Sequence, residues 1–150
     1  MKTLLIEDQV LDAELVTKCL EKMGGKVTVA KNGVSAIRIY DESEWDLIIS
    51  DIDLAKVIDG VDILRYVRQE KSKEELPVLL VTARQMDKDR REHLKALGAN
   101  EVCSKWESVF NSLRKYAEQY DEKSKAEEAT TTLMNSTPAL KFTLRTIAMA

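Results

Sequence analysis

The sequence predicts a doubly wound α/β domain, in which helices cover both faces of a parallel five-stranded sheet, over about residues 1–120. Short apolar runs of strand length alternate with longer segments whose apolar residues recur at helical spacing. Two central runs, residues 46–50 and 77–81, contain continuous apolar stretches, which are typical of strands that helices cover on both faces. Strict alternation with short connections favours right-handed crossovers and therefore a parallel sheet.

Each predicted strand leads into a predicted helix. The strands are residues 3–6, 26–30, 46–50, 77–81 and 101–104. The first helix ends at the Gly24-Gly25 pair, and the other four are residues 33–41, 59–70, 86–97 and 106–120. The predicted buried stripe of the first helix consists of Val10, Leu11, Leu15, Val16, Cys19, Leu20 and Met23.

The composition argues against several classes of protein. Of the 150 residues, 44% are apolar and 33% are charged, which suits one core with a solvated surface and argues against disorder. The 23 Lys and Arg are outnumbered by 26 Asp and Glu, which argues against a chain that holds nucleic acid by bulk positive charge. No apolar run nears the roughly 20 residues of a membrane span, and no signal peptide is evident, so we expect a soluble, cytoplasmic protein without membrane contact. Two cysteines without a CxxC spacing exclude a disulfide framework and a zinc cluster, and Cys19 and Cys103 are predicted to be buried thiols.

Polar side chains collect at the predicted carboxyl ends of four strands. Glu7 and Asp8 follow the first strand, Asp51 the third, Thr82 the fourth and Lys105 the fifth. Ligands bind at this edge of parallel sheets. Each residue alone would be an ordinary solvated loop residue, but together the carboxylates favour Mg²⁺ over zinc, and one of them could accept a phosphoryl group. Mg²⁺, Lys105 and Thr82 would then neutralise the phosphoryl charge.

These residues and their surroundings resemble the receiver domain of two-component response regulators over about residues 2–120. The matching segments are Leu4-Leu5-Ile6-Glu7-Asp8, Asp46-Leu47-Ile48-Ile49-Ser50-Asp51, Asp59-Gly60, Pro77-Val78-Leu79-Leu80-Val81-Thr82-Ala83 and Leu97-Gly98-Ala99-Asn100-Glu101, running on to Lys105. The resemblance implies a CheY-like, flavodoxin-like three-layer sandwich of five β-α units with a C-terminal helical extension.

The resemblance also implies the chemistry of the site. Asp51 would accept a phosphoryl group from the phosphohistidine of a sensor histidine kinase, in a Mg²⁺-dependent reaction. Asp8 and Asp51 would hold Mg²⁺ directly, Glu7 would act through water, and the backbone carbonyl of Asp53 would complete the metal site.

The remaining implied roles concern the phosphoryl group and the output. Thr82 and Lys105 would contact the phosphoryl oxygens. The domain would assist its own phosphorylation and dephosphorylation without being an enzyme for a separate substrate. A conformational switch would alter self-association, with a homodimer expected.

Three departures from the family pattern bear on these expectations. Asp59-Gly60 lies one residue farther from the phospho-acceptor than is usual, and residues 55–58 replace a stretch that contains Pro, so we expect a differently shaped loop. Val102 stands where the family usually has a Tyr or Phe that rotates on phosphorylation. Trp106 stands where the family has Pro after a cis bond, so the sequence leaves a cis or trans bond open.

The last thirty residues follow a different pattern. Residues 121–134 are polar and are predicted to form a linker or a solvated helical extension. Residues 135–150 are predicted to be the truncated start of a second domain, because Thr137-Pro138 begins a helical stripe of Leu140, Leu144, Ile147 and Ala148. Residues 133–140 resemble the opening of the AAA+ domain in NtrC-type transcription activators. The chain has no Walker motif or helix-turn-helix, so contacts with DNA and sigma factor would lie in domains absent from it.

Two alternatives are left open. The segment Asp51-Ile52-Asp53-Leu54 resembles the DxD nucleophile motif of haloacid-dehalogenase-type phosphatases, although those enzymes place DxD on the first strand and the acidic pair late. Val102 and Trp106 also allow a degenerate receiver that acts as an interaction module without phosphorylation. Turnover of a phosphate ester would favour the first alternative, and a phosphoryl group on Asp51 would exclude the second.

Overall fold

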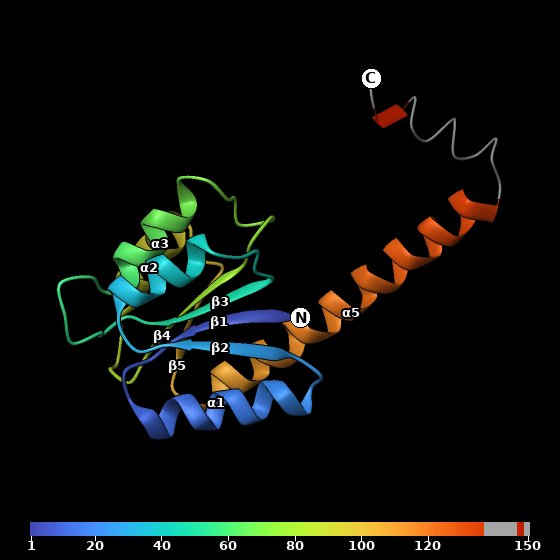
Figure 1. The fold of residues 1–150 in the computed structure, drawn as a ribbon. Helices are drawn as coiled ribbons and strands as arrows, with labels where there is room; N and C mark the ends of the chain where they lie inside the picture. Colours follow the sequence, from blue (N-terminus) through green and yellow to red (C-terminus); the bar gives the residue numbers. More distant parts are fainter. Residues whose placement is uncertain (137–146, 149–150) are drawn as a thin grey trace. The chain divides into compact units, whose positions relative to one another are not determined.

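The computed structural model describes residues 1–136 and 147–148. Five strands form one all-parallel sheet in the order β2-β1-β3-β4-β5 (Figure 1). The strands are β1 (Lys2–Ile6), β2 (Lys26–Ala30), β3 (Leu47–Asp51), β4 (Val78–Thr82) and β5 (Glu101–Ser104). The helices are α1 (Val10–Lys22), α2 (Gly33–Asp41), α3 (Gly60–Arg68), α4 (Lys88–Ala96) and α5 (Glu107–Ser136). This strand order and the strict alternation confirm the predicted doubly wound fold.

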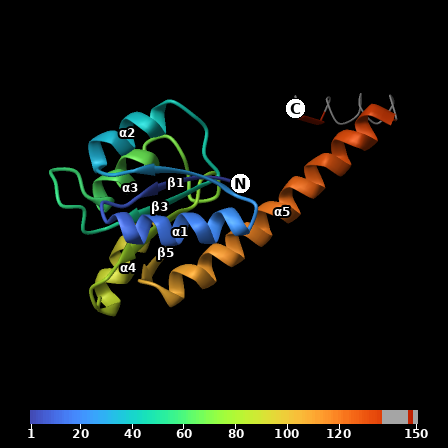
Figure 2. The same cartoon turned by 60° about the horizontal axis from the view of Figure 1, so that its bottom comes forward.

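Helices cover both faces of the sheet. α1 lies on one face, and α2 and α3 lie side by side on the other (Figures 1 and 2). The central strands β3 and β4 are buried at all five of their positions, as their apolar runs predict. Each buried Leu or Ile side chain there contributes about 1.5–3 kcal/mol to folding, so this pair of strands forms the centre of the core.

The register of the sheet brings the carboxyl ends of the strands to one edge. Asp51, the last residue of β3, pairs with Val81, and Thr82, the last residue of β4, pairs with Ser104. The residues directly after β1 and β5 therefore lie beside the ends of β3 and β4. This edge carries every side chain that the sequence predicts for the functional site.

The predicted buried stripe of α1 is partly wrong. The residues of the helix that are buried are Ala13, Val16 and Leu20. Val10, Leu11 and Leu15 are instead 62%, 79% and 45% exposed. Leu11 and Leu15 lie two residues before and after Ala13, which at 3.6 residues per turn places both about half a turn around the helix from it. They therefore face away from the sheet.

The two cysteines differ in burial. Cys103 in β5 is a buried free thiol, as predicted. Cys19 is only half-buried, because it lies six positions after Ala13, which places it at the margin of the buried face of α1.

Two helices begin later than predicted because acidic side chains cap them. Asp59 is the N-cap of α3 and accepts two backbone N–H groups of the first turn, and Asp87 is the N-cap of α4 and accepts one. The helices therefore begin one residue after each cap, at Gly60 and at Lys88, rather than at Asp59 and Met86.

The last helix continues beyond the receiver-like part of the chain. α5 is continuous over residues 107–136, so of the two predictions for residues 121–134, a linker or a solvated helical extension, the structure shows the helical extension. The chain divides into two compact units, residues 1–114 and 115–150. The first turns of α5 belong to the first unit and bury Val109 and Leu113. In the second unit, residues 121–133 are helical and almost all exposed, so the C-terminal extension is a solvated helix.

The predicted start of a second domain falls largely outside the described residues. Residues 137–146 and 149–150 are not described, so the predicted helix start at Thr137-Pro138 and most of its stripe are not part of the observed structure. Ile147, one residue of that stripe, is 66% exposed. Within residues 1–136 and 147–148, no helix combines the length and the apolar character that a membrane span requires.

Candidate functional site

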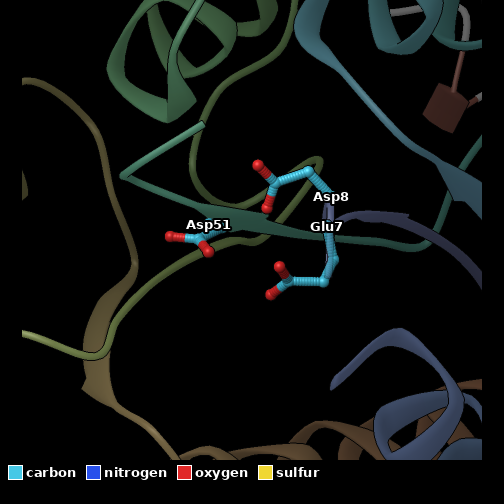
Figure 3. Close-up of side chains that lie close together, drawn as sticks. All are labelled: Glu7, Asp8 and Asp51. Atoms are coloured by element: carbon cyan, nitrogen blue, oxygen red, sulfur yellow. The ribbon is translucent and has the colours of Figure 1, made fainter. Parts of the chain in front are cut away.

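Three carboxylates meet at the carboxyl edge of the sheet (Figure 3). Glu7 and Asp8 directly follow β1, and Asp51 ends the neighbouring strand β3. One oxygen atom of each carboxylate lies within 4.8 Å of those of the other two. Glu7 and Asp51 are buried, while Asp8 is half-buried. The structure thus brings together three side chains that the sequence predicts to be neighbours.

Lys105 supplies the positive charge beside these carboxylates. Its Nζ donates to Glu7 Oε2 at 2.6 Å, to Asp51 Oδ2 at 3.0 Å and to Asp12 Oδ2 at 3.0 Å. The Lys105 side chain is only 7% exposed. Burial alone would lower the pKa of Lys105, but the hydrogen bonds to Glu7, Asp51 and Asp12 outweigh it and raise the pKa well above its ordinary value of 10.5. The ammonium therefore keeps its charge at neutral pH.

Glu7 is the most deeply buried carboxylate of the site. Burial raises the pKa of Glu7 above its ordinary value of 4.5, against the opposing effect of the hydrogen bond from Lys105. The backbone N–H of Gln9 also donates to Glu7 Oε1 at 3.0 Å, and the charge of Asp51 adds to the increase in pKa. The hydrogen bond from Lys105 therefore offsets only part of the effect of burial on the Glu7 pKa.

Both the carboxylate and the backbone of Asp51 are fixed by neighbouring groups. The backbone N–H of Asp53 donates to Asp51 Oδ1 at 2.9 Å, while Oδ2 accepts from Lys105. Behind it, Gly60 at the start of α3 packs directly on the Asp51 backbone, where an added Cβ would lie 2.3 Å from the Asp51 carbonyl oxygen. Only glycine allows α3 to begin this close to the end of β3.

Thr82 is connected to the site by a hydrogen bond with the Asp53 side chain. Its buried hydroxyl donates to Asp53 Oδ2 at 3.2 Å and accepts the backbone N–H of Arg84 at 3.1 Å. The Arg84 guanidinium lies 3.7 Å from Asp53 Oδ1, in a contact that is largely open to solvent. In this state the Thr82 side chain is therefore bonded to a carboxylate beside the site.

The sequence analysis missed Asp12 and the contacts of the Asp53 side chain. Asp12, in the first turn of α1, contacts Lys105, and the Asp53 side chain contacts Thr82 and Arg84. One feature of the sequence could have indicated Asp12. It lies four residues, about one helical turn, after Asp8, in a helix that begins beside the site.

Two of the positions that depart from the family pattern, Val102 and Trp106, make defined contacts, whereas residues 55–57 are exposed. Val102 is buried, 5% exposed, and its carbonyl accepts a hydrogen bond from Arg91 Nη1. The Lys105-Trp106 peptide bond, which the sequence leaves open, is cis. Lys105 Nζ lies 4.9 Å from the centre of the Trp106 ring, and this ring stacks on Phe110.

The carboxylate cluster has the donor chemistry of a magnesium site. Mg²⁺ prefers oxygen ligands, and it binds proteins through one or two carboxylates together with several waters. Here Glu7, Asp8 and Asp51 offer only oxygen atoms, and the half-exposed Asp8 shows that water reaches them. A divalent cation would also offset the cost of burying negative charge at Glu7 and Asp51. The backbone carbonyl of Asp53 as a further ligand stays a prediction.

The fold and the site together define a receiver domain. Residues 3–118 match the response regulator receiver domain family, and the chain belongs to this family. The match spans all five strands and the beginning of α5.

The relatives include both sensor and regulatory proteins. The chain is 33% identical over 136 residues, 91% of its length, to the aerobic respiration control sensor protein ArcB of Escherichia coli. It is 32% identical over 89 residues, 59% of its length, to the probable transcriptional regulator ycf29 of Pyropia yezoensis. The chain covers only 17% of the first relative and 40% of the second.

A solved receiver domain provides the structural comparison. The receiver domain of the sensor histidine kinase PA1611 from Pseudomonas aeruginosa is 25% identical to this chain, with a TM-score of 0.64, over 77% of this chain and 96% of that one. That structure holds a magnesium ion in its active-site cleft.

Proposed function

We propose that this receiver domain accepts a phosphoryl group on Asp51 in a Mg²⁺-dependent reaction. One observation carries the proposal: Asp51 is fixed at the end of a buried central strand, 3.0 Å from the Lys105 ammonium and beside the acidic pair. No other carboxylate of the described site combines these contacts.

The proposed reaction is a phosphoryl transfer from a phosphohistidine. A carboxylate oxygen of Asp51 forms a bond to phosphorus while the bond between phosphorus and the histidine nitrogen breaks, and the imidazole leaves with its bonding electron pair. Lys105 stabilises the negative charge that is spread over the phosphoryl oxygens. Thr82 would exchange its bond with Asp53 for one with a phosphoryl oxygen.

A magnesium ion held by Asp8 and Asp51, with Glu7 acting through water, would supply further positive charge to the transferred group. The residues present fit this assignment, because all three donors are carboxylates that lie within reach of one ion. The structure of the PA1611 receiver domain, with its magnesium ion, supports it.

The proposed partner is a sensor histidine kinase. The similarity to a sensor protein over most of the chain, and to the receiver domain of a sensor histidine kinase, supports this choice. On this proposal the domain is a phospho-acceptor without a separate substrate, rather than an enzyme.

The proposed output is a change in self-association, in which the chain forms a homodimer. This change would control transcription through an NtrC-type AAA+ domain. The similarity to a transcriptional regulator and the resemblance of residues 133–140 to the opening of such domains support it. A receiver that acts as an interaction module without phosphorylation is the alternative that the buried Val102 favours.

Mass spectrometry of the full chain with acetyl phosphate and Mg²⁺ tests the proposal. We expect the wild type to gain one phosphoryl group, Asp51→Asn to gain none, and Asp53→Asn, as the matched control, to gain one. Absence of any gain in the wild type would favour the interaction module. Release of phosphate from an ester substrate would instead favour the phosphatase alternative.

A further inference from the structure

The Lys105 ammonium is fully engaged before any phosphoryl group arrives. An ammonium has three N–H donors, and three carboxylates accept from it: those of Glu7, Asp12 and Asp51, at 2.6, 3.0 and 3.0 Å. A phosphoryl group on Asp51 can therefore contact Lys105 only when one of these carboxylates gives up its bond.

Burial decides which carboxylate is released most easily. The side chains of Glu7 and Asp51 are 4% and 8% exposed, so water cannot take the place of the ammonium beside either carboxylate. The Asp12 side chain is 30% exposed, so water can replace the ammonium there. Asp12 also lies in the first turn of α1, where the helix dipole favours a negative charge. Release of Asp12 is the least costly of the three.

Charge acts in the same direction. A phosphoryl group carries a charge of about −1.5 to −2 at neutral pH, and it would join a site in which Asp12 and Asp51 share a single ammonium. The added negative charge repels Asp12 and attracts Lys105, so both effects weaken the bond between them.

We propose that Asp12 is a positioning residue that holds Lys105 before phosphorylation and releases it to the phosphoryl group, which links phosphorylation to the first turn of α1. This inference rests on the proposed function of Asp51. The contact between Asp12 and Lys105 connects the start of α1 to the residue after β5. Gln9, the N-cap residue of α1, makes no side-chain capping bond that would hold this turn in its place. Loss of the contact between Asp12 and Lys105 therefore loosens the first turn of α1. This link between phosphorylation and α1 does not need an aromatic residue at position 102.

The experiment compares the full wild-type chain with Asp12→Asn, Asp12→Glu and the control Glu14→Gln. Asn keeps the size of Asp12 and removes its charge, whereas Glu keeps the charge. Glu14 is an exposed residue of the same helix, so Glu14→Gln removes one charge outside the site. The rate of phosphoryl uptake from acetyl phosphate with Mg²⁺ is measured by mass spectrometry. Amide hydrogen exchange is measured with and without the donor at the first hydrogen-bonded turn of α1, where the Ala13 N–H donates to the Gln9 carbonyl at 3.0 Å.

The Asp12→Asn variant lacks one charge that competes for Lys105. It should therefore take up the phosphoryl group about three- to tenfold faster than the wild type. Asp12→Glu should restore the slow rate, and Glu14→Gln should match the wild type. In the wild type, phosphorylation should speed amide exchange in the first turn of α1, and in Asp12→Asn exchange should already be fast and should not change. A merely structural role of Asp12 would not make exchange depend on phosphorylation.

The failures are distinguishable. If the wild type gains no phosphoryl group, the proposed function falls and this inference falls with it. If the wild type is phosphorylated but Asp12→Asn reacts at the same rate or more slowly, the inference is wrong while the proposed function stands. Exchange in α1 that does not respond to phosphorylation of the wild type would refute the link to the helix.

Discussion

Replacement of Lys105 by methionine should destabilise the folded chain by about 3–5 kcal/mol in the absence of Mg²⁺, because it leaves buried carboxylates without their cation. Of the three carboxylates involved, Glu7 and Asp51 are 4% and 8% exposed. A hydrogen bond between charged groups contributes about 1.5–3 kcal/mol, so the two buried contacts together reach a similar total. The contact with Asp12, which is 30% exposed, adds little because water screens it.

Urea unfolding followed by Trp45 fluorescence measures this loss. Trp45 is 8% exposed and belongs to the core, so its emission reports on the folded sheet. Both proteins should carry Trp106→Phe, because Lys105 Nζ lies 4.9 Å from the Trp106 ring and its removal would change that emission directly. With a typical slope of about 2 kcal/mol per molar urea, the midpoint should fall by about 1.5–2.5 M.

The matched control is Lys88→Met on α4. Lys88 pairs with Glu92 at 3.8 Å, but the two side chains are 84% and 61% exposed, so the loss should stay below about 0.5 kcal/mol. Adding Glu7→Gln to Lys105→Met should recover part of the stability, and it serves as a second test if the single variant fails to fold. A loss below about 1 kcal/mol for Lys105→Met would refute the argument from burial.

Three further predictions concern the metal, the pH dependence and the packing of the site. Asp8→Ala should abolish Mg²⁺ binding, which calorimetry should place near the millimolar range in the wild type; unchanged affinity would contradict the assigned site. Because the pKa of Glu7 is raised above 4.5 in the folded state, its contribution to stability is greatest below pH 4.5 and is lost as the pH rises through the raised pKa. Without Mg²⁺, Glu7→Gln should remove this loss, and urea midpoints with the same pH dependence as the wild type would disprove it. Gly60→Ala should lower stability by about 1–3 kcal/mol, because its Cβ would lie 2.3 Å from the Asp51 carbonyl oxygen; an unchanged urea midpoint would show that α3 can move aside.

The sequence predicts the edge of the sheet well because topology leaves little choice. Once strands and helices alternate in a parallel sheet, the carboxyl ends of β1, β3 and β5 must lie at one edge. Glu7, Asp51 and Lys105 directly follow or end those strands, so their proximity follows from the chain order.

The contacts of the helices and loops at this edge are harder to predict. Asp12 lies in an amphipathic helix, where a polar residue is most simply interpreted as facing solvent. Its contact with Lys105 depends on the rotation of α1, and the same rotation places Leu11 and Leu15 away from the sheet. The bond from Thr82 to Asp53 depends on side-chain rotamers, which periodicity does not specify.

The complete burial of β3 limits how the protein can relax around a modified Asp51. β3 pairs with β1 on one side and with β4 on the other, and none of its five side chains reaches solvent freely. Such a strand is mechanically stiff, because any displacement would disturb two hydrogen-bond ladders and close-packed side chains at once. If Asp51 is phosphorylated, as we propose, the structural response must therefore come from segments around the strand, such as the first turn of α1 and the loop after β3, where Val57 is 96% exposed. On this proposal, the charge added at a rigid strand would be expressed as movement of these surrounding segments.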